Sequence, residues 1–153
     1  MNTVNQIKNS ENANRTFYRK ANGEYITYPK AVIEFIDSCD NSVEEVYLFL
    51  DDVRDIDYNT ANRFKCCIFC TSVNQAKSFI TKYIDKGVTT IYFDLDHDLG
   101  DYAKDGGDAI KLIDWLIENY HDKHMNFKFH FHSMNPVGVE NMKNAVSKYW
   151  PVV

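Results

Sequence analysis

The sequence contains no long hydrophobic run. None of its apolar stretches approaches the roughly 20 residues that a helix needs to cross a bilayer. Its polar start, MNTVNQIKNSENANR, lacks the apolar core of a secretory signal peptide. We therefore expect a cytoplasmic protein that does not enter a membrane.

The sequence also lacks the cysteine patterns that mark disulfide scaffolds and structural zinc sites. Three of its four cysteines, Cys66, Cys67 and Cys70, lie in one short segment that cannot support a disulfide framework. Cys67 and Cys70 form one C-x-x-C pair, but a structural zinc site needs four ligands and no second pair follows. Free thiols are the expected state.

An excess of positive charge is missing as well. The chain has 17 Lys and Arg residues against 22 Asp and Glu residues, so its formal net charge is -5. No basic face of the kind that binds duplex nucleic acid can be read from the sequence. Any anionic ligand must therefore be held by local features.

What the chain does contain suits one globular domain, with 153 residues of which 44% are hydrophobic and 25% charged. After a polar tail, Asn22 and Gly23 between the runs RTFYRK and EYITY predict a hairpin. Pro29 then begins a segment with apolar residues at helical spacing. We expect residues 1–45 to form this tail, hairpin and helix, packed on a domain of residues 46–153. They could also provide a homo-oligomer contact.

From residue 46 onward, predicted strands alternate with predicted helices. The apolar runs VYLFL, CCIFC, TTIYFDL and FKFHF are typical of buried strands. Helices are expected from the Ser72 and Gln75 capping box to Gly87, over residues 108–120, and after Pro136. Such alternation predicts an α/β fold, a three-layer sandwich whose mostly parallel sheet is covered on both faces.

Polar clusters follow three of these strands. In open α/β sheets, ligands bind at the carboxyl ends of the strands, so the clusters are expected to meet on one rim of the sheet. The residues concerned are Asp51 and Asp52 after the first strand, Asp96, His97 and Asp98 after the third, and His132, Ser133 and Asn135 after the fourth.

Carboxylates this close together repel one another by about 4 kcal/mol per pair at an effective dielectric constant of about 20. A cation is therefore expected among them: a divalent ion, a protonated His97 or His132, or Arg54. Hard oxygen ligands suit Mg²⁺, Mn²⁺ or Ca²⁺ better than zinc. The alternative is that these aspartates are helix caps and solvated loop residues, and that role is expected for Asp105 or Asp108.

Donors and proton carriers are also present near the rim. Asn135-Pro136-x-Gly138 opens a helix whose free backbone N–H groups favour phosphate, and Gly106-Gly107 would let the backbone approach a ligand closely. His97 and His132 suit general acid and base chemistry on a phosphodiester. A packed structural histidine is the alternative, and it is the expected role of His130.

The segments YLFLDDVRD, FDLDHDLGDYAKDGGDAI and FHSMNPVGVENM together resemble the cyclic-phosphate-processing receiver-like domain family. Its members show Asp-Asp-x-Arg, Asp-His-Asp-Leu-Gly and His-Ser-x-Asn-Pro-x-Gly in that order, and the resemblance spans residues 46–149. It implies a receiver-like fold and action on cyclic nucleotides or on cyclic phosphate ends of RNA. The stretch Asp55-Ile56-Asp57-Tyr58 lacks the proline expected in such members.

The resulting hypothesis is a phosphoesterase that opens a cyclic phosphodiester, which would let it counter nucleotide-based immunity. Its expected catalytic residues are His97, His132, Asp52 and Asp98. The residues expected to contact the substrate are Arg54, Ser133, Asn135, Gly138 and Gly107. Mg²⁺ or Mn²⁺ would be held by Asp51, Asp52 and Asp96. The alternative is a cyclic nucleotide binding protein that does not cleave its ligand. A phospho-accepting receiver is disfavoured because the chain closes with YWPVV rather than with a strand ending in Lys-Pro.

Overall fold

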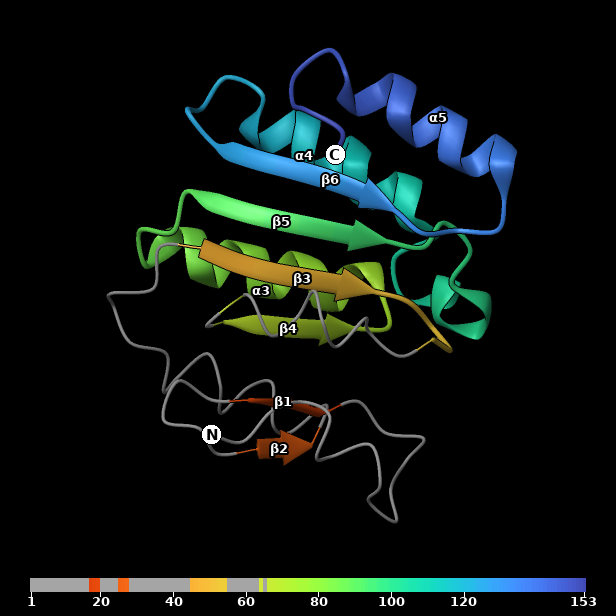
Figure 1. Cartoon of the computed structure of the whole chain (residues 1–153), viewed down its shortest axis with the longest axis horizontal. Helices are drawn as coiled ribbons and strands as arrows, with labels where there is room; N and C mark the ends of the chain where they lie inside the picture. Colours follow the sequence, from red (N-terminus) through yellow and green to blue (C-terminus); the bar gives the residue numbers. More distant parts are fainter. Residues whose placement is uncertain (1–16, 20–24, 28–44, 55–63, 65) are drawn as a thin grey trace.

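The centre of the protein is a four-stranded parallel sheet (Figure 1). The computed structural model describes residues 17–19, 25–27, 45–54, 64 and 66–153. The strands are β3 (Glu45–Leu50), β4 (Cys67–Cys70), β5 (Thr90–Leu95) and β6 (Asn126–Phe131), in the order β4-β3-β5-β6. Each strand pairs in parallel with its neighbours. Val152 adds a parallel bridge to Phe129 at the β6 edge. This is the receiver-like α/β fold predicted from the sequence.

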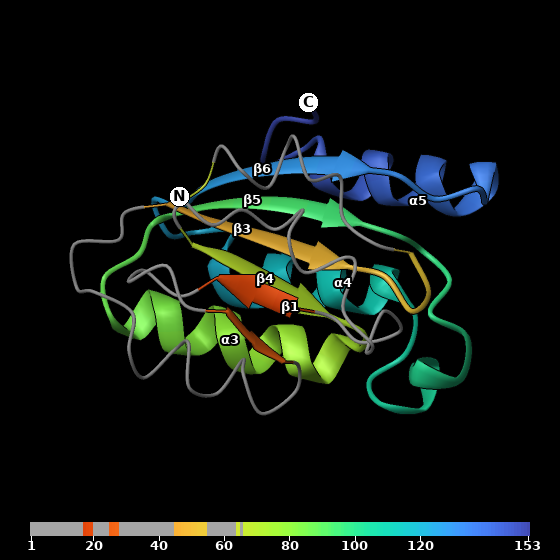
Figure 2. The ribbon, with the colours of Figure 1, turned by 60° about the horizontal axis from the view of Figure 1, so that its bottom comes forward.

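In the described part of the chain, three α-helices connect and flank the strands: α3 (Val73–Asp85), α4 (Ala109–Tyr120) and α5 (Pro136–Val146). α3 and α4 lie on one face of the sheet, and α5 packs against α4 beyond β6 (Figures 1 and 2). The predicted capping box opens α3, because Ser72 accepts a hydrogen bond from the N–H of Gln75 while the Gln75 side chain reaches back. Among the described helices, none combines the length and apolar character needed to span a bilayer.

The two faces of the sheet differ in chemistry, because side chains along a strand alternate between them. One set is apolar and buried, and includes Leu48 and Leu50 of β3 and Phe93 of β5. The other set mixes aromatic and polar groups. In it Tyr47 stacks on Tyr92, and Phe49 stacks on His132 with ring centroids 4.8 Å apart. Polar side chains are therefore placed on the sheet itself as well as at its rim.

The predicted hairpin is confirmed by an antiparallel pair near the N-terminus. β1 (Phe17–Arg19) pairs with β2 (Tyr25–Thr27), and Tyr18 lies opposite Ile26. The helix predicted after Pro29 lies outside the described residues. A short 3₁₀ helix, η2 (Gly100–Lys104), follows β5 and begins the loop that leads to α4.

Candidate functional site

Asp51 is the first residue after β3, and it is buried at the carboxyl end of the strand. Its Oδ1 accepts hydrogen bonds from the backbone N–H groups of Val53 (2.8 Å) and Arg54 (2.7 Å), and its Oδ2 lies 2.8 Å from Nε2 of His132. Burial alone would raise the pKa of Asp51, but these hydrogen bonds lower it below its ordinary value. Asp51 is therefore an ionised carboxylate held by fixed donors.

His132 bridges two buried carboxylates. Its Nε2 faces Asp51, and its Nδ1 lies 2.6 Å from Oδ1 of Asp94. Both nitrogens can donate only when the ring is an imidazolium cation. Burial alone would lower the pKa of His132, but the hydrogen bonds and charges of Asp51 and Asp94 raise it to about 9. At neutral pH the ring is therefore charged and both of its nitrogens are occupied.

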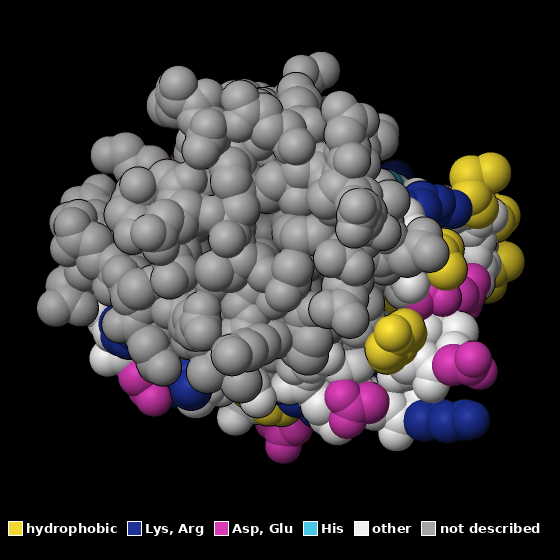
Figure 3. Space-filling model, turned by 90° about the horizontal axis from the view of Figure 1, so that it is seen from below, with side chains coloured by type: hydrophobic (Ala, Val, Ile, Leu, Met, Phe, Trp, Pro, Cys, Tyr) yellow, Lys and Arg dark blue, Asp and Glu magenta, His cyan; other side chains and the backbone are white. Residues whose placement is uncertain are grey.

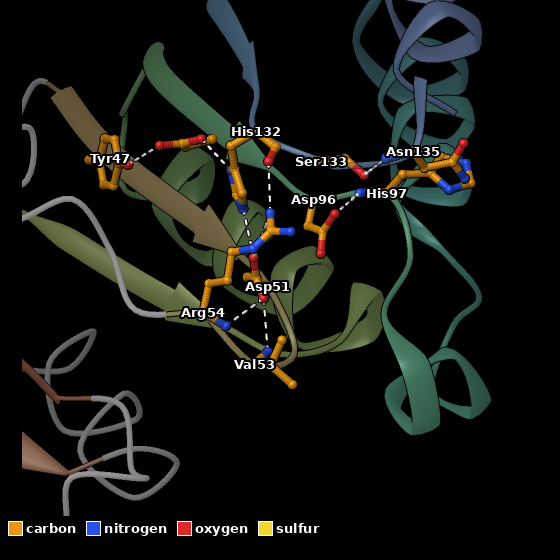
Figure 4. Close-up of polar contacts among 10 residues, drawn as sticks. Tyr47, Asp51, Val53, Arg54, Asp96, His97, His132, Ser133 and Asn135 are labelled. Carbon is orange, nitrogen blue, oxygen red and sulfur yellow. Dashed lines mark hydrogen bonds and ion pairs between the residues drawn. The ribbon is translucent and has the colours of Figure 1, made fainter. Parts of the chain in front are cut away.

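Asp94 and Tyr47 extend this arrangement across the sheet. The Tyr47 hydroxyl donates to Oδ2 of Asp94, and both side chains are buried. Burial and the adjacent Asp94 carboxylate raise the pKa of Tyr47 well above its ordinary value, so the hydroxyl keeps its proton. We call the four residues Tyr47, Asp94, His132 and Asp51 the buried polar chain, and Figure 4 shows its course from β3 to the rim.

Sequence reasoning did not select Tyr47 or Asp94 as site residues. The available signal was Asp94 itself, a carboxylate that follows the apolar run of a predicted strand and is followed by Leu95. Such a group needs a buried donor, and β-strand alternation places it on the same face as His130 and His132 of the next strand.

Arg54 connects the loop after β3 to the end of β6. Its Nη1 donates to the backbone carbonyl of His132 at 2.8 Å and lies 4.0 Å from Oδ2 of Asp51. The side chain is 39% exposed. One edge of the guanidinium is thus fixed against the protein while the group remains accessible from solvent.

Asp51, Asp52 and Asp96, the acidic triad, each offer one oxygen, and these oxygens lie within 4.8 Å of one another. Burial and the neighbouring carboxylates of Asp51 and Asp96 raise the pKa of Asp52. Gly100 approaches the triad closely, because a Cβ there would lie 2.6 Å from Oδ2 of Asp52. The all-oxygen, partly buried donor set fits a hard divalent cation such as Mg²⁺ or Mn²⁺.

His97 and Asp98 form a second group, the His97–Asp98 pair. Nδ1 of His97 lies 2.8 Å from Oδ1 of Asp98, and the Asn135 side-chain amide donates to Oδ2 of Asp98 at 3.0 Å. The hydrogen bond from His97, with that from Asn135, lowers the pKa of Asp98. Among the described residues, no hydrogen bond involves Nε2 of His97. That nitrogen remains available for proton transfer.

The His97 ring packs directly against α5. A Cβ at Gly138 would lie 2.5 to 2.8 Å from three atoms of the ring, so only glycine leaves room for it. The Gly138 N–H donates to Oδ1 of Asn135 at 2.9 Å, and Ser133 Oγ accepts from the Asn135 N–H at 3.1 Å. These contacts cap α5 and place Asn135 beside Asp98.

The glycine loop before α4 leads to Asp108, whose carboxylate offers an oxygen within 4.8 Å of ligand atoms of His97 and Asp98. The Gly107 N–H donates to the carbonyl of Ala103 at 2.8 Å, so it is used within the loop itself. Asp105 accepts from Ser72 and Asn74 at the start of α3. Asp108 occupies the N-cap position of α4 without bonding to that helix, and its Oδ1 accepts from the N–H of Leu99 instead. The expectation that Asp105 or Asp108 caps α4 through its side chain is therefore wrong, because both carboxylates bond to neighbouring segments instead.

The acidic triad and the His97–Asp98 pair are adjacent. Oδ1 of Asp96, in the triad, accepts a hydrogen bond from the backbone N–H of His97 at 2.8 Å. Figure 4 shows Asp96 pointing toward Asp51 and His97 lying beside Asn135. The structure therefore brings the three polar clusters of the sequence to the same end of the sheet.

Exposed apolar side chains alternate with these polar residues along the chain. Val53 is 81% exposed, Met134 82% and Val137 70%, and each is next to a residue described above. Figure 3 shows hydrophobic, basic and acidic side chains together at its right-hand end, toward which the strands point in Figure 1. Exposed apolar groups beside a polar site often contact a ligand.

Comparison with protein-family models matches residues 46–148 to the Cyclic-phosphate processing Receiver domain. The match covers more than half of the chain and contains the four strands of the parallel sheet, except for Glu45, and every site residue described above. Its name associates the matched family with the processing of cyclic phosphates. The searches of curated proteins and of solved structures found no match.

Proposed function

The chain belongs to the cyclic-phosphate-processing receiver family, and on that premise we propose that it hydrolyses a cyclic phosphodiester in a nucleotide. The substrate would be a cyclic nucleotide messenger or the cyclic phosphate end of an RNA. The observation that carries this proposal is that the His97–Asp98 pair lies next to three carboxylates suited to a divalent cation. In this pair, Nε2 of His97 is available for proton transfer.

His97 is the proton-transfer group of the proposed reaction. Asp98 fixes the ring through Nδ1, and Asn135 in turn holds Asp98. Nε2 can then take a proton from the attacking water or return one to the leaving oxygen. The role of Asp98 is to orient the ring.

The acidic triad would hold Mg²⁺ or Mn²⁺ through Asp51, Asp52 and Asp96. A bound divalent cation supplies neutralisation of phosphate charge and polarisation of a phosphoryl oxygen. Arg54 contributes further donors, because the guanidinium is held at one edge by the His132 carbonyl and is accessible from solvent.

His132 suits a fixed cation better than a second proton carrier. The expectation from sequence gave both histidines a part in proton exchange. Both nitrogens of His132, however, face buried carboxylates, so a substrate would have to displace one of these contacts to reach the ring. We therefore assign His132 the role of holding Asp51 ionised and in place.

The exposed apolar residues favour a nucleotide over a smaller cyclic phosphate. Val53, Met134 and Val137 would contact the base while the phosphate lies at the polar groups beside them. No long-range positive field is required, which agrees with the net charge of -5.

The proposal is tested with a panel of cyclic mononucleotides, cyclic dinucleotides and RNA ending in a cyclic phosphate. Products are identified by mass spectrometry for the wild type and for His97→Gln, with the exposed His124→Gln as the matched control. We expect His97→Gln to lower the rate by about 10²-fold or more, the usual contribution of a proton-transfer group, and His124→Gln to match the wild type. An unchanged rate in His97→Gln would remove His97 from the mechanism.

One observation favours a second candidate function, sequestration without cleavage. Hydrolysis commonly uses both an acid and a base, whereas the rim offers one imidazole whose Nε2 makes no hydrogen bond among the described residues. A binding protein would need no proton carrier at all. Denaturing the protein after incubation separates the two functions: intact ligand is recovered from a binding protein, and the ring-opened product from an enzyme.

A further inference from the structure

The buried polar chain connects two motif residues at the rim, Asp51 and His132, to Asp94 and Tyr47 on the sheet. Its links are Tyr47 to Asp94, Asp94 to His132 and His132 to Asp51, and each is a direct hydrogen bond between side chains. Asp51 belongs to the acidic triad. We propose that Tyr47 and Asp94 are positioning residues that hold the His132 ring against Asp51 and thereby set the affinity of the acidic triad for a divalent cation.

The first step of the argument is the orientation of His132. The ring is stacked on Phe49 with an angle of 3° between the planes, which fixes its plane but would still allow a 180° flip about the Cβ–Cγ bond that exchanges its nitrogen and carbon positions. The bond from Nδ1 to Asp94 removes this freedom and directs Nε2 at Oδ2 of Asp51. Asp94 therefore decides where the Nε2 donor points.

The second step is the orientation of Asp94. Its side chain is 8% exposed, so the carboxylate oxygens depend on protein donors rather than on water. Tyr47 supplies the donor for Oδ2, which leaves Oδ1 facing His132. Tyr47 is held in turn by ring contacts with Phe64 and Tyr92, at centroid distances of 5.0 and 5.5 Å. Removing the Tyr47 hydroxyl would free Asp94 to turn without changing any charge.

The third step concerns the triad. His132 and the two backbone donors together engage both oxygens of Asp51, so the direction of its remaining lone pairs depends on all three contacts. Groups that orient a ligating carboxylate typically change metal affinity by 10- to 100-fold when removed. The inference rests on the metal site of the proposed function, and it does not require that the protein hydrolyse anything.

The test measures Mn²⁺ binding to the full chain at a fixed neutral pH, by the electron paramagnetic resonance signal of free Mn²⁺. Tyr47→Phe is the central variant because it keeps the ring and the charge. Tyr120→Phe is the matched control, a buried tyrosine at the end of α4 that packs on Trp115 and Phe127. Asp94→Asn weakens the link on which the His132 orientation depends, because it removes the negative charge and replaces one acceptor oxygen by an NH2 donor.

We expect Asp94→Asn to weaken Mn²⁺ binding by about tenfold or more, Tyr47→Phe to weaken it by a smaller but measurable factor, and Tyr120→Phe to leave it unchanged. Wild-type affinity in a folded Tyr47→Phe would overturn the inference, as would the absence of Mn²⁺ binding to the wild type. If the wild type binds Mn²⁺ and cleaves no substrate, the proposed hydrolysis is wrong. The positioning roles are then still decided by Mn²⁺ binding to Tyr47→Phe and Asp94→Asn.

Discussion

Nε2 of His132 lies 2.8 Å from Oδ2 of Asp51, although the two residues follow strands β6 and β3, which are separated by β5. The contact joins a buried carboxylate to an imidazolium that is also bound to Asp94. The positive charge of His132 partly compensates the negative charges of Asp51 and Asp94 at the end of the sheet. The contribution of this contact can be measured as a change in the free energy of unfolding with pH.

The stability of the protein should decrease from neutral to alkaline pH. The pKa of His132 is about 9 in the folded chain, whereas an unfolded histidine titrates near roughly 6.5. The raised pKa stabilises the fold fully below the unfolded value, and this contribution is lost as pH rises through the folded value. The loss is at most about 1.4 kcal/mol per pH unit and about 3 kcal/mol in total.

Urea unfolding with a chelator present, at several pH values between about 6 and 10, measures this effect. In His132→Gln the decrease should be largely absent, whereas in the exposed His124→Gln control it should persist. A free energy of unfolding in the wild type that stays constant over this range would mean that His132 is not an imidazolium in the folded chain.

Replacing Gly138 by Ala should reduce activity without a matching loss of stability. A Cβ at this position would overlap the His97 ring at 2.5 Å, so the ring must leave its place beside Asp98. Gly138 is in the first turn of α5, where alanine favours the helix over glycine by up to about 1 kcal/mol. The measurements are the hydrolysis rate and the unfolding free energy of the same preparation.

Gly87→Ala is the matched control. Gly87 has a φ of 98° and nothing within 4 Å of an added Cβ, so alanine there strains the backbone far from His97. This variant should lose stability and keep its activity, the reverse of Gly138→Ala. Equal activity in both variants would contradict the role given to the His97–Asp98 pair.

Magnesium should raise the melting temperature through the acidic triad. A ligand present at 100 times its dissociation constant stabilises the folded state by about 2.7 kcal/mol. Asp96→Asn should abolish the shift, because it removes one of the three carboxylates. Burial and repulsion from Asp51 and Asp96 together raise the pKa of Asp52. Without metal, Asp96→Asn should be at least as stable as the wild type, since the repulsion from Asp96 is removed.

Differential scanning fluorimetry with and without Mg²⁺ gives both results, and Asp101→Asn, at an exposed acidic residue of η2, is the control. A magnesium shift that survives in Asp96→Asn would place the metal elsewhere.

The strands and the gathering of polar residues at one end of the sheet could be predicted from sequence. VYLFL is a continuous apolar run and FKFHF alternates phenylalanine with polar residues, and both patterns predict strands. The carboxyl ends of parallel strands share one edge. The motifs therefore located Asp51, His97 and His132 without knowledge of the strand order.

The roles of individual residues could not be predicted in the same way. Whether His132 is a proton carrier or a fixed cation depends on Asp94, which becomes its partner only once β5 and β6 pair with Asp94 opposite His130. Asp108 precedes a helix as a cap would, yet its side chain bonds to Leu99 because the loop folds back toward the rim. Tyr149 continues the apolar spacing of α5 but is 46% exposed, because the helix ends at Val146.

The most direct test of the proposed hydrolysis is to incubate the wild type with the panel of cyclic nucleotides in water labelled with oxygen-18. The account predicts a ring-opened phosphate monoester that carries one labelled oxygen, formed by the wild type and much more slowly by His97→Gln. Recovery of every ligand intact and unlabelled, after the protein has bound it and been denatured, would contradict hydrolysis.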